Sequence, residues 1–207
     1  MSRPRKGLFV VLEGPDKSGK STQARRLTAA LLSRGVRVLR TREPGGTGVA
    51  EGIRKVLLDP GLKVSPTAEL FLYEASRAQH TDEVLRPALA RGEVVVCERY
   101  TMSTDVYQGV ARGLGLKTTA ALNRTATNGL TPDLTIVINI PDTEFAKRDT
   151  NRKLDRLERE HDDFHAKVRK AYSTLARTAK KTILLDGTRP EEDIHLEIVK
   201  RVTAKIK

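Results

Sequence analysis

Near its N-terminus the chain carries the octapeptide Gly14-Pro15-Asp16-Lys17-Ser18-Gly19-Lys20-Ser21 between a short apolar run and a helix-forming stretch. It matches the pattern G-x-x-x-x-G-K-[ST] at every fixed position. The glycines allow a tight turn that brings backbone N–H groups close to anionic oxygens, and the N-terminus of the following helix also attracts them. The octapeptide therefore predicts a phosphate-binding loop between the first strand and first helix of an α/β fold.

Two polar side chains of this loop have an expected task. Lys20 is expected to reach the β- and γ-phosphates of a nucleoside triphosphate, and Ser21 to offer its hydroxyl to Mg²⁺. The predicted phosphate-binding residues are Gly14, Pro15, Asp16, Lys17, Ser18, Gly19, Lys20, Ser21 and Thr22. Kinases, switches and motor ATPases all use such a loop, so other segments must separate them.

Short apolar runs rich in β-branched residues alternate with helical stretches along the chain. The predicted strands are Leu8–Glu13, Val36–Thr41, Val94–Glu98, Leu134–Ile140 and Thr182–Asp186. Strands of this kind are typical of a parallel sheet that is buried on both faces. We therefore predict an α/β fold of the P-loop NTPase type, with a five-stranded parallel sheet and helices on both faces.

The stretches between the strands read as helices. They are predicted at Lys20–Ser33, Val49–Leu58, Ser65 to about Gly92 with a bend or break at Pro87, Lys117–Asn128, His161–Ala179 and Glu191–Ile206. The very charged stretch of residues 142–160 is predicted to be a mobile lid within a single domain spanning residues 1–207. A plain solvated helix fits its pattern equally well.

The formal charge of +12, from 38 Lys and Arg against 26 Asp and Glu, indicates an anionic partner. Nucleotides, nucleic acids and membrane surfaces all qualify, but the chain has no zinc-finger spacing and no RNP-type aromatic pattern. The apolar run Leu8–Leu12 is too short to span a bilayer. A single cysteine, Cys97, excludes an intramolecular disulfide. We expect a cytoplasmic protein that binds neither nucleic acid nor membrane.

Polar residues also follow the second and third predicted strands, at the edge where open α/β sheets bind ligands. The segment Thr41–Thr47 follows one strand and Glu98-Arg99-Tyr100 follows the other. Between them, Tyr73 and Arg77 are four residues apart and share one helix face. A ring and a guanidinium on one face suit a nucleobase, because the ring stacks and the guanidinium donates to a carbonyl. Without further context, a core Tyr73 and a surface Arg77 are the more frequent arrangement.

The combination of segments resembles thymidylate kinases, which are P-loop nucleoside monophosphate kinases, from end to end. The most specific matches are Thr41–Thr47, Arg77–His80, Tyr100–Gly109, Pro132–Leu134 and Asp155–Glu158. The resemblance implies ATP- and Mg²⁺-dependent phosphorylation of dTMP to dTDP for dTTP synthesis, by a homodimer.

The resemblance also assigns roles at the acceptor end. Tyr73 would stack on thymine, Arg77 would bond the base, and Ser103, Thr104 and Gln108 would lie near it. Tyr107 would crowd the 2′ position and so favour deoxyribose. Asp16 would contact the 3′-hydroxyl, while Arg42 and Arg99 would bind the acceptor phosphate.

At the donor end the resemblance places Arg148 and Arg152 in the lid. Members of the family supply catalytic positive charge either from a basic residue in the phosphate-binding loop or from a lid arginine, and this chain has both kinds. We expect Lys17, Lys20, Arg99 and Arg152 to be catalytic. Lys17 is hypothesised to contact the transferred phosphate, and Arg148 to cover the adenine.

Two positions depart from the family pattern. Glu98 stands where Asp is usual, and Asn139 stands where Asp is frequent. Glu98 is expected to orient Mg²⁺ through water. A Glu-Arg pair at the end of the third strand, as in Glu98-Arg99, is also typical of deoxynucleoside kinases, where the Glu is the base for a 5′-hydroxyl. That family remains an alternative, although Thr41–Thr47 and Asp16-Lys17 fit a monophosphate acceptor better. A regulatory or nucleic-acid-dependent P-loop ATPase is the second alternative.

Overall fold

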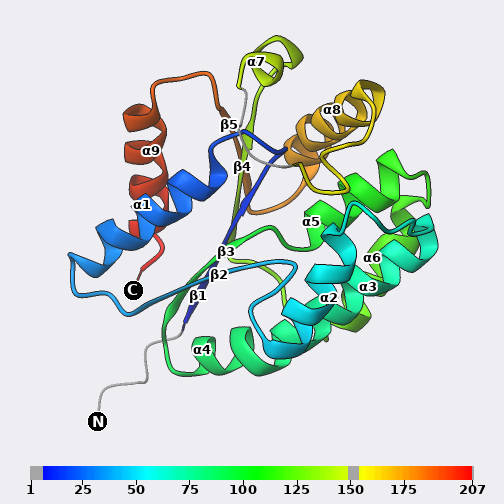
Figure 1. Ribbon diagram of the computed structural model, residues 1–207. Helices are drawn as coiled ribbons and strands as arrows, with labels where there is room; N and C mark the ends of the chain where they lie inside the picture. The colour runs from blue at the N-terminus through cyan, green and yellow to red at the C-terminus, as the bar shows by residue number, and fades with distance from the viewer. Residues whose placement is uncertain (1–6, 149–153, 207) are drawn as a thin grey trace.

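The computed structural model describes residues 7–148 and 154–206. Five parallel strands lie at the centre of the molecule in the order β2-β3-β1-β4-β5 (Figure 1). Their bounds are β1 Leu8–Glu13, β2 Val38–Arg42, β3 Val94–Glu98, β4 Leu134–Asn139 and β5 Thr182–Asp186. The predicted α/β fold with a five-stranded parallel sheet is therefore confirmed.

The central strands owe their position to their side chains. Every residue of β1 is buried, and its register places Leu8 beside Val94 on one side and Val10 beside Leu134 on the other. Apolar side chains on both faces require cover on both faces. Strands β2 and β5 have half-exposed positions and form the two edges.

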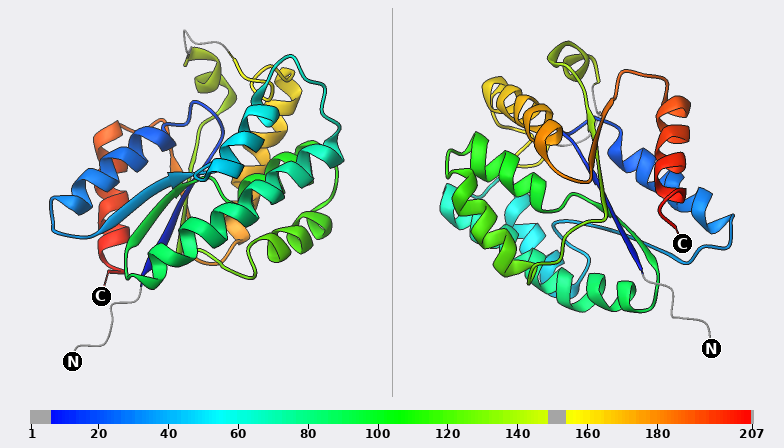
Figure 2. Two further views of the ribbon diagram at one scale, coloured as in Figure 1. Left: turned by 60° about the horizontal axis from the view of Figure 1, so that its bottom comes forward. Right: turned by 180° about the vertical axis from the view of Figure 1, so that it is seen from behind.

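Helices cover both faces of the sheet (Figure 2). On one face lie α1 (Lys20–Leu32) and α9 (Glu191–Thr203), whose Leu27, Leu31 and Ile198 pack on alternate residues of β1. The opposite layer holds α2 Gly48–Leu58, α3 Pro66–His80, α4 Arg86–Ala90, α5 Thr101–Thr104, α6 Leu116–Ala126 and α8 Asp162–Thr178. None of the helices in the two described ranges is long and apolar enough to cross a membrane.

The helix is not broken at Pro87. The chain stays helical from Pro66 to Ala90, but the stretch between α3 and α4, η1 (Thr81–Leu85), has the wider turns of a π-helix. Pro87 lacks an N–H, so one carbonyl of the preceding turn has no helical donor from this residue. The change of hydrogen-bond pattern before the proline keeps the helix continuous.

Residues 101–111, which were not predicted to be helical, form α5 and a second π-helix, η2 (Asp105–Ala111). Within the charged stretch of residues 142–160, for which a lid and a plain solvated helix were both open, residues 142–147 form α7 (Asp142–Lys147). Residues 101–111 contain several β-branched and aromatic residues, which are weak helix formers. Packing stabilises this segment instead, because Val106 and Tyr107 are buried against α8.

Candidate active site

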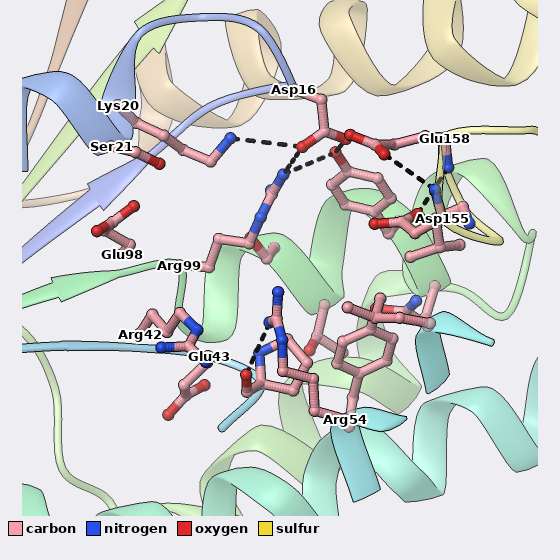
Figure 3. Close-up of a pocket in the computed structure, with 18 residues that line it drawn as sticks. Asp16, Lys20, Ser21, Arg42, Glu43, Arg54, Glu98, Arg99, Asp155 and Glu158 are labelled. Carbon is pink, nitrogen blue, oxygen red and sulfur yellow. Dashed lines mark hydrogen bonds and ion pairs between the residues drawn. The ribbon is translucent and has the colours of Figure 1, made fainter. Parts of the chain in front are cut away.

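A pocket of about 280 Å³ opens at the carboxyl edge of β1, β2 and β3 (Figure 3). It lies between the phosphate-binding loop and the helices α2 and α3. The predicted site residues that line it are Asp16, Lys20, Ser21, Arg42, Tyr73, Glu98, Arg99, Ser103, Thr104, Tyr107 and Gln108. The tertiary structure thus brings together residues from five separate segments of the chain.

The phosphate-binding loop has the backbone that its glycines require. Gly14 has φ +142°, and a Cβ there would lie 2.1 Å from the carbonyl oxygen of Ile138. Gly19, also at positive φ, precedes the first residue of α1, Lys20. The Lys20 Nζ donates to the carbonyl of Pro15 at 3.0 Å and lies 3.5 Å from the Asp16 carboxylate. Burial, together with the nearby Arg99, lowers the pKa of Lys20 to about 8.

Asp16 joins the loop to the pocket. Arg99 Nη2 donates to its Oδ1 at 2.5 Å, and the Tyr107 hydroxyl donates to its Oδ2 at 3.3 Å. Burial opposes ionisation of Asp16, but the charges of Arg99 and Lys20 outweigh it and hold the pKa of this carboxyl below its usual range. Burial raises the pKa of the Tyr107 hydroxyl, so this group keeps its proton as a donor.

Arg99 is the centre of the site's hydrogen bonds. It follows β3 directly and has φ +67°, which turns the chain away from the strand direction. Its Nη1 donates to the Gly14 carbonyl at 3.1 Å and to the Tyr172 hydroxyl at 3.1 Å. A positive charge is therefore fixed between the phosphate-binding loop and the rest of the pocket.

Beneath Arg99, Glu13 is fully buried at the end of β1. Its carboxylate accepts from the Ser103 hydroxyl at 2.7 Å, from the Tyr172 hydroxyl at 3.0 Å and from the N–H groups of Tyr100 and Ser103. Burial raises the pKa of Glu13 in spite of these bonds. These contacts tie Tyr100 and Ser103, which follow Arg99 in the chain, and Tyr172 of α8 to the central strand.

The far end of the pocket combines a ring with arginines. Tyr73, half-buried on α3, lines the pocket with Arg42 and Arg54. Arg42 donates to the Glu51 carboxylate at 3.0 Å, and Arg54 donates to the Pro44 carbonyl at 2.9 Å. Burial and the neighbouring Arg42 lower the pKa of Arg54.

Sequence reasoning missed Arg54. It lies on the same stripe of α2 as the buried Ala50 and Leu57, so an arginine on an apolar helix face was the available signal. The pocket is also lined by Asp155, Leu157 and Glu158, which the sequence analysis used as a motif without giving them roles.

Arg77 does not line the pocket. Its side chain is 2% exposed, and its guanidinium pairs with Glu43 at 2.8 Å and with Glu74 at 2.7 Å. It also donates to Thr104 Oγ1 at 2.8 Å and to the Tyr100 carbonyl at 3.1 Å. Arg77 is thus a buried ionic centre behind the pocket wall, and direct contact with a base stays a prediction.

Lys17 and Arg148 also lie outside the pocket lining. The Lys17 Nζ is 4.8 Å from the centre of the Phe145 ring on α7. Arg148 donates to the Lys17 carbonyl at 3.1 Å and to the Gly187 carbonyl at 2.8 Å. Helix α7 is therefore docked on the phosphate-binding loop. The role of Lys17 at the transferred phosphate stays a prediction, and Arg152 lies outside the described residues.

The residues expected to hold Mg²⁺ suit that ion. Ser21 supplies a hydroxyl and Glu98 a carboxylate, and both line the pocket beside Lys20. In the described ranges no group of three or more His, Cys, Asp or Glu forms a dedicated metal cage. Mg²⁺ bound with a nucleotide keeps several waters and takes one or two protein oxygens together with phosphate oxygens. An all-oxygen pair of this kind therefore fits.

Comparisons with known proteins identify relatives of this chain. The family model described as thymidylate kinase matches residues 12–198. A thymidylate kinase of Deinococcus radiodurans is 45% identical over 194 residues, covering 93% of this chain and 94% of the relative. One from Pseudomonas fluorescens is 48% identical over 187 residues, covering 89% of each chain. One from Leifsonia xyli is 44% identical and covers 98% of this chain and 97% of the relative. The chain belongs to the thymidylate kinase family.

Proposed function

We propose that this protein transfers the γ-phosphoryl group of ATP to dTMP and so forms dTDP, a step of dTTP synthesis. The observation that carries the proposal is the position of Asp16. It belongs to the phosphate-binding loop, and its carboxylate bonds Arg99 and Tyr107 of the adjoining pocket. A donor bound by the loop and an acceptor bound in the pocket would therefore meet at one place.

The acceptor end suits a deoxynucleotide. Tyr73 offers a ring for stacking on the base, and Gln108 offers a side-chain amide beside it. The Tyr107 hydroxyl lies 3.3 Å from Asp16 Oδ2, where the sugar would lie, and Tyr107 lines the pocket, so its ring would crowd a 2′-hydroxyl. Arg42, Arg54 and Arg99 supply positive charge for the acceptor phosphate.

The reaction between two polyanions is mainly a problem of charge and position. The acceptor phosphate oxygen is already nucleophilic, so no strong general base is needed. Lys20 and Arg99 lower the repulsion between the phosphates and hold the reacting groups in line. Ser21 directly and Glu98 through water would hold Mg²⁺, which supplies charge neutralisation on the donor phosphates.

We also propose that α7 and residues 154–160 belong to the lid, within one kinase domain. Arg148 supports a donor-side role for α7, because it joins the phosphate-binding loop to the loop after β5. A homodimer and a cytoplasmic location are further parts of the proposal. The first is supported by the apolar side chains that α2 and α3 leave exposed, Val49, Val56 and Phe71. The second is supported by the single, buried thiol of Cys97.

The second candidate is a deoxynucleoside kinase, which the pocket position of Glu98 favours. A carboxylate there is able to accept the proton of a 5′-hydroxyl if the acceptor is a nucleoside.

A coupled assay of ATP consumption decides between the candidates. It is run with dTMP, dUMP and thymidine, and with DNA in the absence of any acceptor. We expect turnover with dTMP to exceed turnover with thymidine. Turnover with thymidine alone would assign the nucleoside kinase activity, and DNA-stimulated hydrolysis without an acceptor would assign an ATPase.

A further inference from the structure

A buried ionic cluster lies behind the acceptor pocket, away from the phosphate-binding loop. Its centre is Glu69 on α3, which is 0% exposed. The Glu69 carboxylate accepts from Gln108 Nε2 at 2.8 Å, pairs with Arg112 at 3.1 Å and pairs with Arg156 at 2.7 Å. A fully buried carboxylate with three side-chain donors fixes the elements that carry those donors relative to one another.

Arg156 joins this cluster to the end of α2. Its Nε donates to the Leu57 carbonyl at 2.8 Å, and its backbone N–H donates to the Leu58 carbonyl at 3.2 Å. Carbonyls in the last turn of a helix have no partner within the helix, so these two bonds satisfy groups that would otherwise be open. The neighbours of Arg156, Asp155 and Leu157, line the pocket, whereas Arg156 does not.

Every element that Glu69 and Arg156 connect contributes a wall of the acceptor pocket. Helix α2 contributes Arg54 and Leu58, and η2 contributes Gln108, one of the donors to Glu69. Helix α3 contributes Tyr73, four residues after Glu69 and so on the same helix face. The ion pair thus joins these three elements to residues 155–158, which form the fourth wall of the pocket.

We propose that Glu69 and Arg156 are positioning residues for the acceptor, which set its affinity without touching it. The proposal rests on the proposed function, since it assumes that this pocket holds the acceptor. Loss of the pair lets the wall formed by residues 155–158 move away from α2 and α3, so the pocket loses its fit to the ligand. Among the described residues, none of the contacts of Glu69 or Arg156 reaches the phosphate-binding loop, so ATP binding is not disturbed directly.

The test compares Arg156→Met with a matched control, Arg86→Met. Arg86 is also half-buried and also caps carbonyls at a helix end, those of Thr127 and Asn128 after α6, but it does not line or brace the acceptor pocket. Both variants lose an arginine that satisfies backbone carbonyls. A purely structural effect therefore lowers Tm in both variants. It also changes the KM values for the acceptor and for ATP to the same extent in both.

We expect Arg156→Met to raise KM for the acceptor about tenfold, within the range for a residue that acts through a packed network. Its KM for ATP stays within about twofold of the wild-type value, as expected when only the acceptor site loses uniform binding. Arg156→Lys gives an intermediate KM, because a single ammonium does not reproduce the fork that holds both Glu69 and the Leu57 carbonyl. Arg86→Met leaves both KM values unchanged.

The double variant Glu69→Gln/Arg156→Met keeps the test decisive if removal of one charge prevents folding, since it leaves no unpaired partner in the pair. We expect its KM for the acceptor to rise about tenfold over the wild-type value while its KM for ATP stays within about twofold, because the ion pair that joins the pocket walls is absent. An unchanged acceptor KM in folded Arg156→Met or in the double variant, or an equal rise in both KM values, overturns the proposal. The acceptor used is whichever one the wild-type enzyme phosphorylates best, so a wrong assignment of dTMP and a wrong role for the pair give different results.

Discussion

The charge states of single site residues are set by their neighbours before any substrate binds. Lys20, Arg99 and Asp16 form a compact group in which one carboxylate is shared by two cations. The arginine stays charged, and the carboxylate stays ionised because its pKa is held low. Lys20 is the member of this group whose protonation responds near neutral pH, because burial and Arg99 lower its pKa to about 8.

This pKa predicts proton uptake when ATP binds above pH 8. The free enzyme then holds Lys20 partly neutral, and the incoming phosphates favour the ammonium form, so binding draws a proton from the buffer. Calorimetry at pH 8.5 in two buffers with different ionisation enthalpies measures this uptake. Lys20→Arg, which stays charged at that pH, is expected to show none; equal uptake in both proteins would remove Lys20 as its source.

The lowered pKa of Lys20 also makes the free energy of unfolding depend on pH. The folded pKa of Lys20, about 8, lies below the value of roughly 10.4 for an exposed lysine. Between these two values the unfolded chain binds more protons than the folded chain, so this group makes the ligand-free protein more stable as pH rises through that interval. Thermal unfolding of wild type and Lys20→Met between pH 7.5 and 10 is expected to show the smaller pH response in the variant.

Tyr107 is predicted to select deoxyribose. Tyr107→Phe keeps the ring and loses the hydroxyl that donates to Asp16, whereas Tyr107→Ala opens the pocket. We expect the ratio of kcat/KM for deoxyribonucleotide over ribonucleotide acceptors to fall more in the alanine variant than in the phenylalanine variant. Identical ratios in all three proteins would exclude Tyr107 from sugar selection.

Among the secondary-structure elements, α7 contacts the phosphate-binding loop at Lys17. Phe145 lies against the Lys17 ammonium and Arg148 holds the Lys17 carbonyl, so both the side chain and the backbone of Lys17 contact α7. The Phe145 ring also stacks on His165 of α8, with ring centres 5.4 Å apart. The loop and the first part of the proposed lid therefore form one connected unit.

Kinetics of two variants test how this unit divides its work. Lys17→Gly is expected to lower kcat by about tenfold to a thousandfold, the range for losing a donor to developing charge, with a smaller effect on KM for ATP. Arg148→Ala is expected to raise KM for ATP more than it lowers kcat, because it loosens the donor side. A silent Lys17→Gly, beside an Arg152→Ala variant without turnover, would place the catalytic charge in the lid.

For the whole molecule, exposed apolar side chains indicate which face is available for self-association. Helices α2 and α3 lie side by side and expose Val49, Val56 and Phe71, of which Phe71 is 56% exposed. Helix α9, on the opposite face of the sheet, exposes Leu196 at 59%. Three exposed apolar side chains on two neighbouring helices are a better candidate for self-association than the one that α9 exposes.

Sedimentation velocity tests the proposed dimer. We expect wild type to sediment as a dimer at micromolar concentration and Phe71→Glu to dissociate, because the change buries an unpaired charge in the interface. Leu196→Glu is the matched control and is expected to remain dimeric. A wild-type monomer, or equal dissociation of both variants, contradicts the assignment of this face.

Local patterns in the sequence determined the strands, the phosphate-binding loop and most of the helices. The run Leu8–Leu12 is apolar on both faces, so it favours a central strand, and Gly14, at φ +142°, has a backbone conformation that glycine adopts without a steric cost. These are constraints between near neighbours in the chain, or between a strand and water, and they are visible in the order of the residues. The resemblance to thymidylate kinases rested on the same short segments.

Only the tertiary structure decided which partners the charged side chains have. Arg77 and Arg54 are both arginines on helix faces, yet Arg77 is enclosed by Glu43 and Glu74 while Arg54 lines the pocket. Arg156 meets Glu69 across 87 positions of sequence, although neither residue has a local signal that points to the other. Ion pairs of this kind depend on how helices pack on the sheet, because burial removes the water that would otherwise satisfy each charge.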